Sequence, residues 1–273
     1  MTGTALDHPA FDHPPVVETV MGCSFPPIEG WGIPHFGLYW AEIRDRFPKS
    51  LDQPALPASN DDASNSIPSI RFQVNQLSSA ARCWFHNTEE TKLIQIQRDQ
   101  FHFNCKRGLT NEPYPHYKLI RPDFEREWTV FIEFLEKNNL PTPLVASCEI
   151  SYVNYIDNLG PPHERVPLSE FFPVWSGATH HGFLRQPELH NLVVAYPLDN
   201  NRGRLRIHVQ PVLLQSDRKE MIQLILTAAG RPPAHDLNSI LQWFDEAQDF
   251  LVRGFDDFTS EKLHQLWGVK SAQ

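Results

Sequence analysis

The chain has 273 residues, of which 41% are hydrophobic and 21% are charged, a balance that excludes global disorder and allows a sizeable core. Its formal net charge of −9 argues against a nucleic-acid or anionic-membrane binder, because such a protein needs a basic face. No apolar run reaches the length of a membrane span and the first residues lack the pattern of a signal peptide, so we expect a cytoplasmic protein with no membrane partner.

Four segments divide the chain. Residues 1–15 are polar and contain prolines, which is typical of a flexible N-terminal arm. Residues 16–156 form an N-terminal half with strand and helix patterns, interrupted at residues 51–68 by a loop rich in Pro, Ser, Asn and Asp. Residues 157–190 form an irregular connecting segment, and residues 191–273 carry strands and a long helix. We expect the two patterned parts to make one compact unit.

The first elements are a strand and a helix. Residues 16–25 have the pattern of a strand that ends at Pro26, and residues 34–47 have an apolar stripe at helical spacing that ends at Pro48. The stripe consists of Phe36, Trp40, Ile43 and Phe47. After the loop, we expect residues 70–74 to begin the sheet again.

The most regular stretch covers residues 81–156. We expect a strand at residues 82–86, followed by a strand, a turn and a second strand within residues 91–104. Side chains alternate between the two faces of a strand. Ile94 and Ile96 occupy even positions while Phe101 and Phe103 occupy odd ones, so one straight strand would place apolar residues on both faces. A turn at residues 98–100 removes this conflict and predicts an antiparallel meander.

A helix follows the meander. Asp123 is the predicted N-cap, and an apolar stripe at spacings of four, three and four follows it. The stripe consists of Phe124, Trp128, Phe131 and Leu135. Residues 148–156 then alternate as a strand that places Asn154 on an otherwise apolar face, where a buried amide needs hydrogen-bond partners. Those partners are either backbone groups or a ligand in a cavity.

The C-terminal part predicts three strands and two helices. The strands are expected at residues 192–196, 204–210 and 221–229, with a turn at residues 200–203. Asp236 is the predicted N-cap of a long helix, and residues 259–267 predict a short one. The stripe of the long helix consists of Leu237, Ile240, Leu241, Phe244, Ala247, Leu251 and Phe255.

These elements predict an α+β fold in which amphipathic helices pack on one face of an antiparallel sheet. Two versions stay open. One is a helix-grip-like arrangement, in which a curved sheet holds the long C-terminal helix. The other consists of two similar α+β lobes, since each half has a meander followed by an amphipathic helix.

Several short segments of the sequence resemble those of a sporadically distributed bacterial protein family with no assigned activity. They include residues 14–18, residues 92–99 with Phe101, residues 148–156, and a C-terminal group. The C-terminal group consists of Phe255, Thr259, His264, Trp267 and Gly268. The resemblance spans nearly the whole chain and implies a complete bacterial protein, but it supplies no catalytic residues.

The cysteines and histidines of the sequence do not form a recognisable metal or cofactor motif. The four cysteines, Cys23, Cys83, Cys105 and Cys148, do not have metal-site spacing, so we expect buried free thiols. The histidines His163, His180, His181 and His190 match no standard zinc site. Phosphate-binding glycine loops and nucleophile elbows are absent from the sequence. We therefore expect neither a metal nor a cofactor.

The main functional hypothesis is a non-catalytic binding or interaction protein whose ligand is a small molecule or a peptide. Its expected cavity is lined by aromatic and amide side chains, namely Gln95, Gln97, Tyr152, Asn154 and Trp175. One alternative is an enzyme that uses Glu149, Asp157 or a histidine of the 157–190 segment as acid or base. The other is an antitoxin-like or immunity-like module whose negative charge suits a basic protein partner, and a homodimer also stays open.

Overall fold

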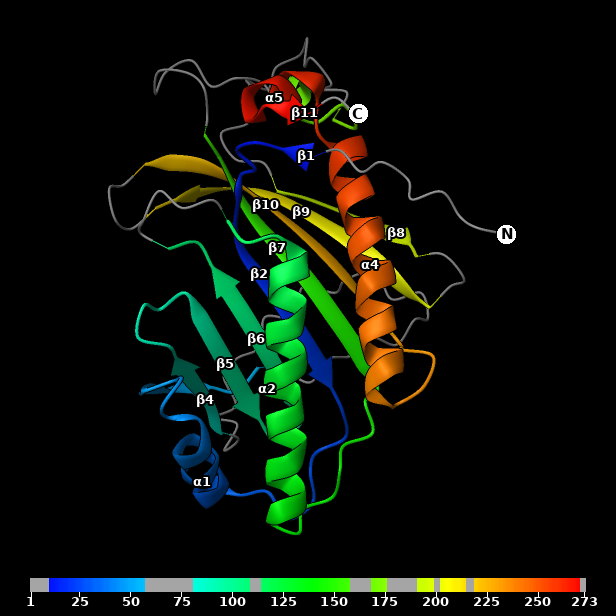
Figure 1. The fold of residues 1–273 in the computed structure, drawn as a ribbon. Coiled ribbons are helices and arrows are strands. Elements are labelled where there is room, and N and C mark those ends of the chain that lie inside the picture. Colours follow the sequence, from blue (N-terminus) through cyan, green and yellow to red (C-terminus); the bar gives the residue numbers. More distant parts are fainter. Residues whose placement is uncertain are drawn as a thin grey trace, which may run out of the picture.

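The computed structural model describes residues 10–56, 81–108, 114–157, 168–175, 191–198, 202–214 and 219–270. Nine antiparallel strands form one open sheet in the order β3-β4-β5-β6-β2-β7-β10-β9-β8 (Figure 1). A separate two-stranded ribbon pairs β1 with β11. The strands are β1 (Ala10–Phe11), β2 (Val16–Ser24), β3 (Lys49–Pro54), β4 (Ala81–His86), β5 (Lys92–Gln97), β6 (Gln100–Lys106), β7 (Ser147–Asp157), β8 (Leu192–Pro197), β9 (Gly203–Leu213), β10 (Glu220–Gly230) and β11 (Val269–Lys270).

Two long helices lie side by side over one face of the sheet (Figure 1). In α2, Phe131 packs against Phe101 of β6 at a ring-centroid distance of 5.1 Å. Phe124 of α2 meets Phe244 of α4 at 4.9 Å, so the two helices share one aromatic core. The helices are α1 (Ile33–Ile43), α2 (Tyr117–Lys137), α3 (Leu168–Phe171), α4 (Leu237–Phe258) and α5 (Glu261–Trp267).

The alternation of side chains gives the sheet two different faces. Ile96 lies opposite Phe101 in the register of β5 and β6, and both residues belong to the side that α2 and α4 cover, here called the helix face. Gln95 lies opposite His102 and belongs to the other side, here called the outer face. The helix face is apolar and buried, whereas the outer face carries most of the polar residues of the strands.

The expected α+β class, with helices on one face of an antiparallel sheet, is confirmed. Each half contributes a three-strand meander followed by a long helix, β4-β5-β6 with α2 and β8-β9-β10 with α4. The halves join through β2 and β7 at the centre of the sheet. They therefore form one continuous sheet and do not divide into two lobes with separate sheets.

The start of α2 corrects the prediction that Asp123 caps this helix. The helix begins at Tyr117 and continues through Pro122, although proline cannot donate the backbone bond that this position requires. The Asp123 carboxylate forms ion pairs with Lys92 and Arg126 instead. Packing of the long aromatic stripe on the sheet outweighs the local signals of Pro122 and Asp123.

Other boundaries also differ from the expectation. The loop predicted at residues 51–68 overlaps β3, which pairs with β4 and so extends the sheet by one strand. Residues 57–80, which contain the strand expected at 70–74, lie outside the described residues. The arm predicted at residues 1–15 contains β1, which pairs with β11 and packs Phe11 against Trp267. Among the described residues, no helix is both long and apolar enough to cross a membrane.

Candidate functional site

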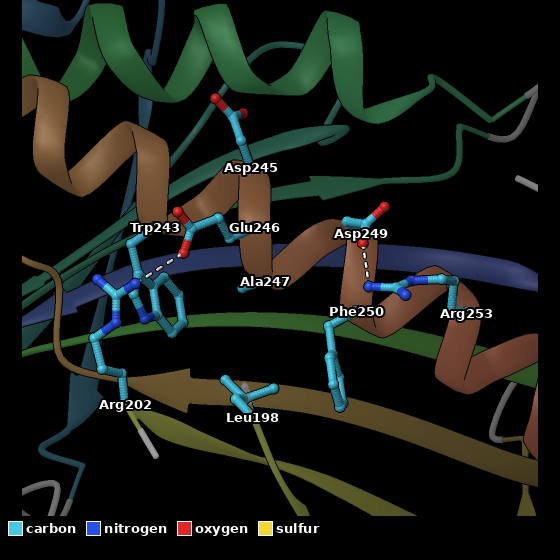
Figure 2. Close-up of a pocket in the computed structure, with 9 residues that line it drawn as sticks. All are labelled: Leu198, Arg202, Trp243, Asp245, Glu246, Ala247, Asp249, Phe250 and Arg253. Carbon is cyan, nitrogen blue, oxygen red and sulfur yellow. Dashed lines mark hydrogen bonds and ion pairs between the residues drawn. The ribbon is translucent and has the colours of Figure 1, made fainter. Parts of the chain in front are cut away.

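A surface hollow of about 430 Å³ lies beside α4 (Figure 2). One wall is α4 itself, and the other is formed by Leu198 and Arg202, which flank the end of β8 and the start of β9. The lining residues are Leu198, Arg202, Trp243, Asp245, Glu246, Ala247, Asp249, Phe250 and Arg253.

The floor of the hollow is apolar. Leu198, Trp243 and Ala247 are buried, and Phe250 is half-buried. Figure 2 shows the Trp243 and Phe250 side chains projecting from α4 toward the side on which Leu198 lies. Trp243 also makes an edge-to-face contact with Phe244 of the aromatic core, with ring centroids 5.4 Å apart. The floor of the hollow is therefore continuous with the aromatic core.

The rim of the hollow is charged and internally paired. The Arg202 guanidinium lies 3.5 Å from Glu246, which also accepts a hydrogen bond from Gln242 at 2.9 Å. One turn further along α4, Arg253 pairs with Asp249. Both pairs are solvent-exposed, so each contributes only about 0–1 kcal/mol to stability. These charges can therefore exchange partners at little cost.

Asp245 points away from the floor and toward α2 (Figure 2). Its carboxylate accepts hydrogen bonds from Tyr117 at 2.8 Å and from Arg121 at 2.8 and 3.2 Å. Burial, and then the contact with Asp245, raise the pKa of Tyr117. Asp245 thus fastens α4 to α2 and is not available for chemistry in the hollow.

The local sequence explains why the walls lie where they do. The Asp236 side chain accepts from the Ser239 amide at 3.0 Å and fixes the start of α4. A Cβ on Gly254 would lie 2.6 Å from Leu205 Cδ2, so this glycine lets α4 approach β9 closely. A Cβ on Gly203 would lie 2.3 Å from the Ala229 carbonyl oxygen. Glycine is therefore required beside Arg202, where β9 and β10 come together.

Of the five residues predicted to share a cavity, Gln95 and Gln97 lie on the outer face. The Gln95 carbonyl accepts from Trp84 at 2.7 Å and from Arg82 at 3.1 Å, and its amide donates to Asn104 at 2.7 Å. Gln97 exchanges hydrogen bonds with the backbone of Leu56. Both side chains are buried and hydrogen-bonded to other protein groups.

The other three predicted residues lie elsewhere. Asn154 is buried on the helix face and donates to the backbone carbonyls of Leu224 and Tyr152 at 3.0 and 3.3 Å, which is the backbone alternative considered above. The Tyr152 hydroxyl bonds to Gln248 of α4. Trp175 packs at the edge of the core, and its amide donates to Phe172. The five residues therefore do not converge on one cavity.

The residues that line the hollow were not predicted, although α4 carries a signal for them. Trp243, Glu246, Phe250 and Arg253 recur at spacings of three, four and three, which defines a second stripe beside the core stripe. Leu198 and Arg202 have no such signal, because only the fold brings the start of β9 to α4.

The two carboxylates considered as acid or base, Glu149 and Asp157, are not neighbours in the structure. Both residues lie on β7 and are eight residues apart, which places them ~26 Å apart along an extended strand. Asp157 pairs with Lys219. The histidines His163, His180, His181 and His190 lie outside the described residues.

One arrangement at the junction of α4 and α5 resembles a hydrolase triad in composition. Thr259 Oγ1 lies 2.8 Å from His264 Nε2, and His264 Nδ1 lies 3.7 Å from Asp256. The Thr259 hydroxyl, however, donates its proton to the Phe255 carbonyl at 2.7 Å, so His264 must donate to Thr259 and cannot act as its base. The three residues fix the turn between the helices.

The described residues contain no group of three or more His, Cys, Asp or Glu side chains that could hold a metal ion. Cys23, Cys83, Cys105 and Cys148 are buried and unbridged, as the sequence predicted. Burial raises the pKa of Cys83 and Cys105 to about 11, so both are protonated and unreactive at neutral pH.

No model of a known protein family matches the chain, and no curated protein matches it either. The resemblance to a bacterial family described above therefore stays a prediction.

Proposed function

We propose that the protein is a non-catalytic binding protein of the cytoplasm, and that the hollow beside α4 holds a small organic ligand with an apolar body and a charged end. The observation that carries the proposal is the combination of an apolar floor with a rim of weakly paired charges. A volume of about 430 Å³ lies within the range of small-molecule sites. The four cysteines are buried and form no disulfide, which supports a reducing compartment such as the cytoplasm.

The chemistry of the lining favours binding over catalysis. The nine lining residues include no histidine, cysteine, serine or lysine, and each of the three carboxylates already interacts with an arginine. A ligand carboxylate could replace Glu246 beside Arg202, because that ion pair is long and exposed. The half-buried Phe250 ring would be covered by the ligand's apolar body, which supplies most of the affinity.

The first test is native mass spectrometry of the protein purified from its native host. We expect a small co-purifying mass that is lost on mild denaturation. A stoichiometric second protein without a small mass would instead favour the interaction module. Turnover of the co-purified compound during incubation would favour the enzyme.

The second test uses anilinonaphthalene sulfonate, a dye with an aromatic body and an anionic group, as a fluorescent reporter. Phe250→Ala should weaken dye binding about tenfold, because it removes the exposed part of the apolar floor. Leu119→Ala removes an exposed apolar side chain from α2 and should leave dye binding unchanged. Equal loss in both variants, or no loss in Phe250→Ala, would exclude the hollow as the site.

A further inference from the structure

The two edge strands of the sheet, β3 and β8, differ in their protection against an added strand. β3 carries the charged residues Lys49 and Asp52 and ends in Pro54, and such residues discourage pairing with another chain. β8 carries no charged residue, and its Val193 and Tyr196 side chains are 46% and 39% exposed. β8 is therefore an apolar edge without the charges that usually prevent strand addition.

The backbone of β8 presents hydrogen-bonding groups along this edge. The Leu198 amide donates to the Gly203 carbonyl at 3.0 Å, so the backbone of Leu198 faces β9. Because this orientation alternates along an antiparallel pair, the even-numbered residues of β8 bond to β9, while Val193 and Ala195 direct their N–H and C=O groups away from it. Pro197 occupies the next outward position, where its missing N–H costs no bond to β9. Among the described residues, no further strand pairs with β8 on that side.

Positive charge lies beside this edge on the outer face. Arg204 and Arg206 of β9 alternate with buried core residues, are exposed, and form no ion pair with another described residue. The register places them opposite Pro197 and Ala195 of β8. In a chain whose net charge is −9, two adjacent arginines without a counter-ion make this part of the sheet locally basic.

A strand added to β8 would bring its own outer-face residues toward these arginines. The added strand would lie about 10 Å from β9, with β8 between them. Its residues opposite Ala195 and Pro197 would point to the outer face, as Arg204 and Arg206 do. Because the side chains of Ala195 and Pro197 are short, an arginine of β9 and a glutamate of the added strand can extend toward each other over β8.

The other face of the added strand would meet an apolar surface. Tyr196 lies opposite the buried Leu205 and therefore belongs to the helix face, yet its side chain is partly exposed. An apolar side chain on the helix face of the added strand would cover the exposed part of this ring. The segment that fits the edge thus alternates acidic and apolar residues.

We propose that β8 is the docking edge for an extended, acidic segment of a partner protein, which adds a strand to the sheet. The backbone groups of Val193 and Ala195 supply the hydrogen bonds, and Arg204 and Arg206 select the acidic segment. A second copy of β8 fits this edge less well, because it brings no carboxylate to the arginines. The assignment does not depend on whether the hollow binds a ligand.

The test uses two capped synthetic peptides of the length of β8, one alternating glutamate with valine and the other alternating lysine with valine. Added to the full chain at low salt, the glutamate peptide should shift the backbone amide resonances of Val193 and Ala195. Its Kd should be at least about tenfold lower than that of the lysine peptide, and salt should reduce this difference. Absence of shifts at the two amides, or equal affinity for both peptides, would overturn the proposal.

Charge reversal at β9 tests the role of the arginines. Arg206→Glu should weaken binding of the glutamate peptide about tenfold and strengthen binding of the lysine peptide. The matched control is Arg44→Glu, the same substitution at an exposed arginine that caps the end of α1, which should leave both affinities unchanged. Equal effects of the two substitutions, or no effect of Arg206→Glu, would contradict the assignment.

Amide hydrogen exchange in the wild type tests the edge without any variant. In the free protein, the outward amides of Val193 and Ala195 should exchange much faster than the amides of Val194 and Tyr196, which bond to β9. The glutamate peptide should slow exchange at Val193 and Ala195. Protection of these two amides in the free protein would show that the edge is already covered and would overturn the proposal. Protection that increases with protein concentration would identify a second copy as the occupant, and protection independent of concentration would identify a segment of the same chain.

Discussion

The imidazole of His102 lies directly against Gly22, where an added Cβ would come within 2.1 Å of His102 Cδ2. Burial, with a smaller contribution from Arg82, lowers the pKa of His102 from its ordinary value of 6.5 to about 4. Since the unfolded chain binds a proton at higher pH than the folded chain does, acid favours unfolding. The stability contribution of His102 is complete above pH 6.5 and is lost as the pH falls from there toward about 4.

His102→Gln should therefore reduce the loss of unfolding free energy between neutral pH and about pH 4.5. Urea unfolding of wild type and variant at the two pH values measures this difference. An identical loss in both proteins would show that His102 is protonated as easily in the folded chain as in the unfolded one.

The alternation of side chains along each strand shows that the predicted cavity residues do not all lie on one face of the sheet. Gln95 alternates with Ile94 and Ile96 and so belongs to the face opposite the core, whereas Asn154 shares the parity of Ile150. The alternation of side chains alone therefore predicts that the two amides lie on opposite faces of the sheet. What the sequence did not contain was the partner of each amide, because Gln95–Asn104 and Asn154–Leu224 join strands that only the register brings together.

At the scale of a single element, Asp236→Ala should lower Tm by about 2–3 °C, because the cap bonds to Ser239 are lost. The hydrogen bonds from Ser239 also lower the pKa of Asp236, so this contribution is present at neutral pH and fades in acid. Differential scanning calorimetry measures the change.

Asp257→Ala is the control, since it makes the same substitution at an exposed position in the last turn of α4. Removing a negative charge from that end of the helix should leave Tm unchanged or slightly higher. Equal destabilisation by both substitutions would mean that the cap of Asp236 contributes nothing specific.

Elements with strong periodicity were predictable, and elements defined by tertiary contacts were not. The stripes of α4 and the alternation of β9 place these elements within a few residues of their observed ends. The start of α2 was missed because Pro122 and Asp123 normally mark a helix boundary, yet the helix begins at Tyr117. β3 was missed because its side chains are mostly exposed, so it has no apolar pattern.

For the whole molecule, the junction of β2 with β7 implies that the two halves unfold together. Trp128 of α2 and Trp243 of α4 report on different halves, yet their helices share the contact of Phe124 with Phe244. We expect a single denaturant transition, with coincident curves from circular dichroism and tryptophan fluorescence.

Amide hydrogen exchange should likewise give similar opening free energies for β5 and β9, one strand from each half. Two separated transitions, or protection in one half that outlasts the other, would mean that the halves are independent folding units despite their common sheet.

The ribbon that joins the chain ends has a mechanical consequence. Ala10 lies opposite Lys270, and Phe11 lies opposite Val269, so both ends of the chain leave this ribbon on the same side. Antiparallel hydrogen bonds run perpendicular to the strands, and a force that pulls the two ends apart acts along those bonds. Such a force would open the ribbon one bond at a time. The ribbon should therefore yield at a lower force than the nine-stranded sheet behind it.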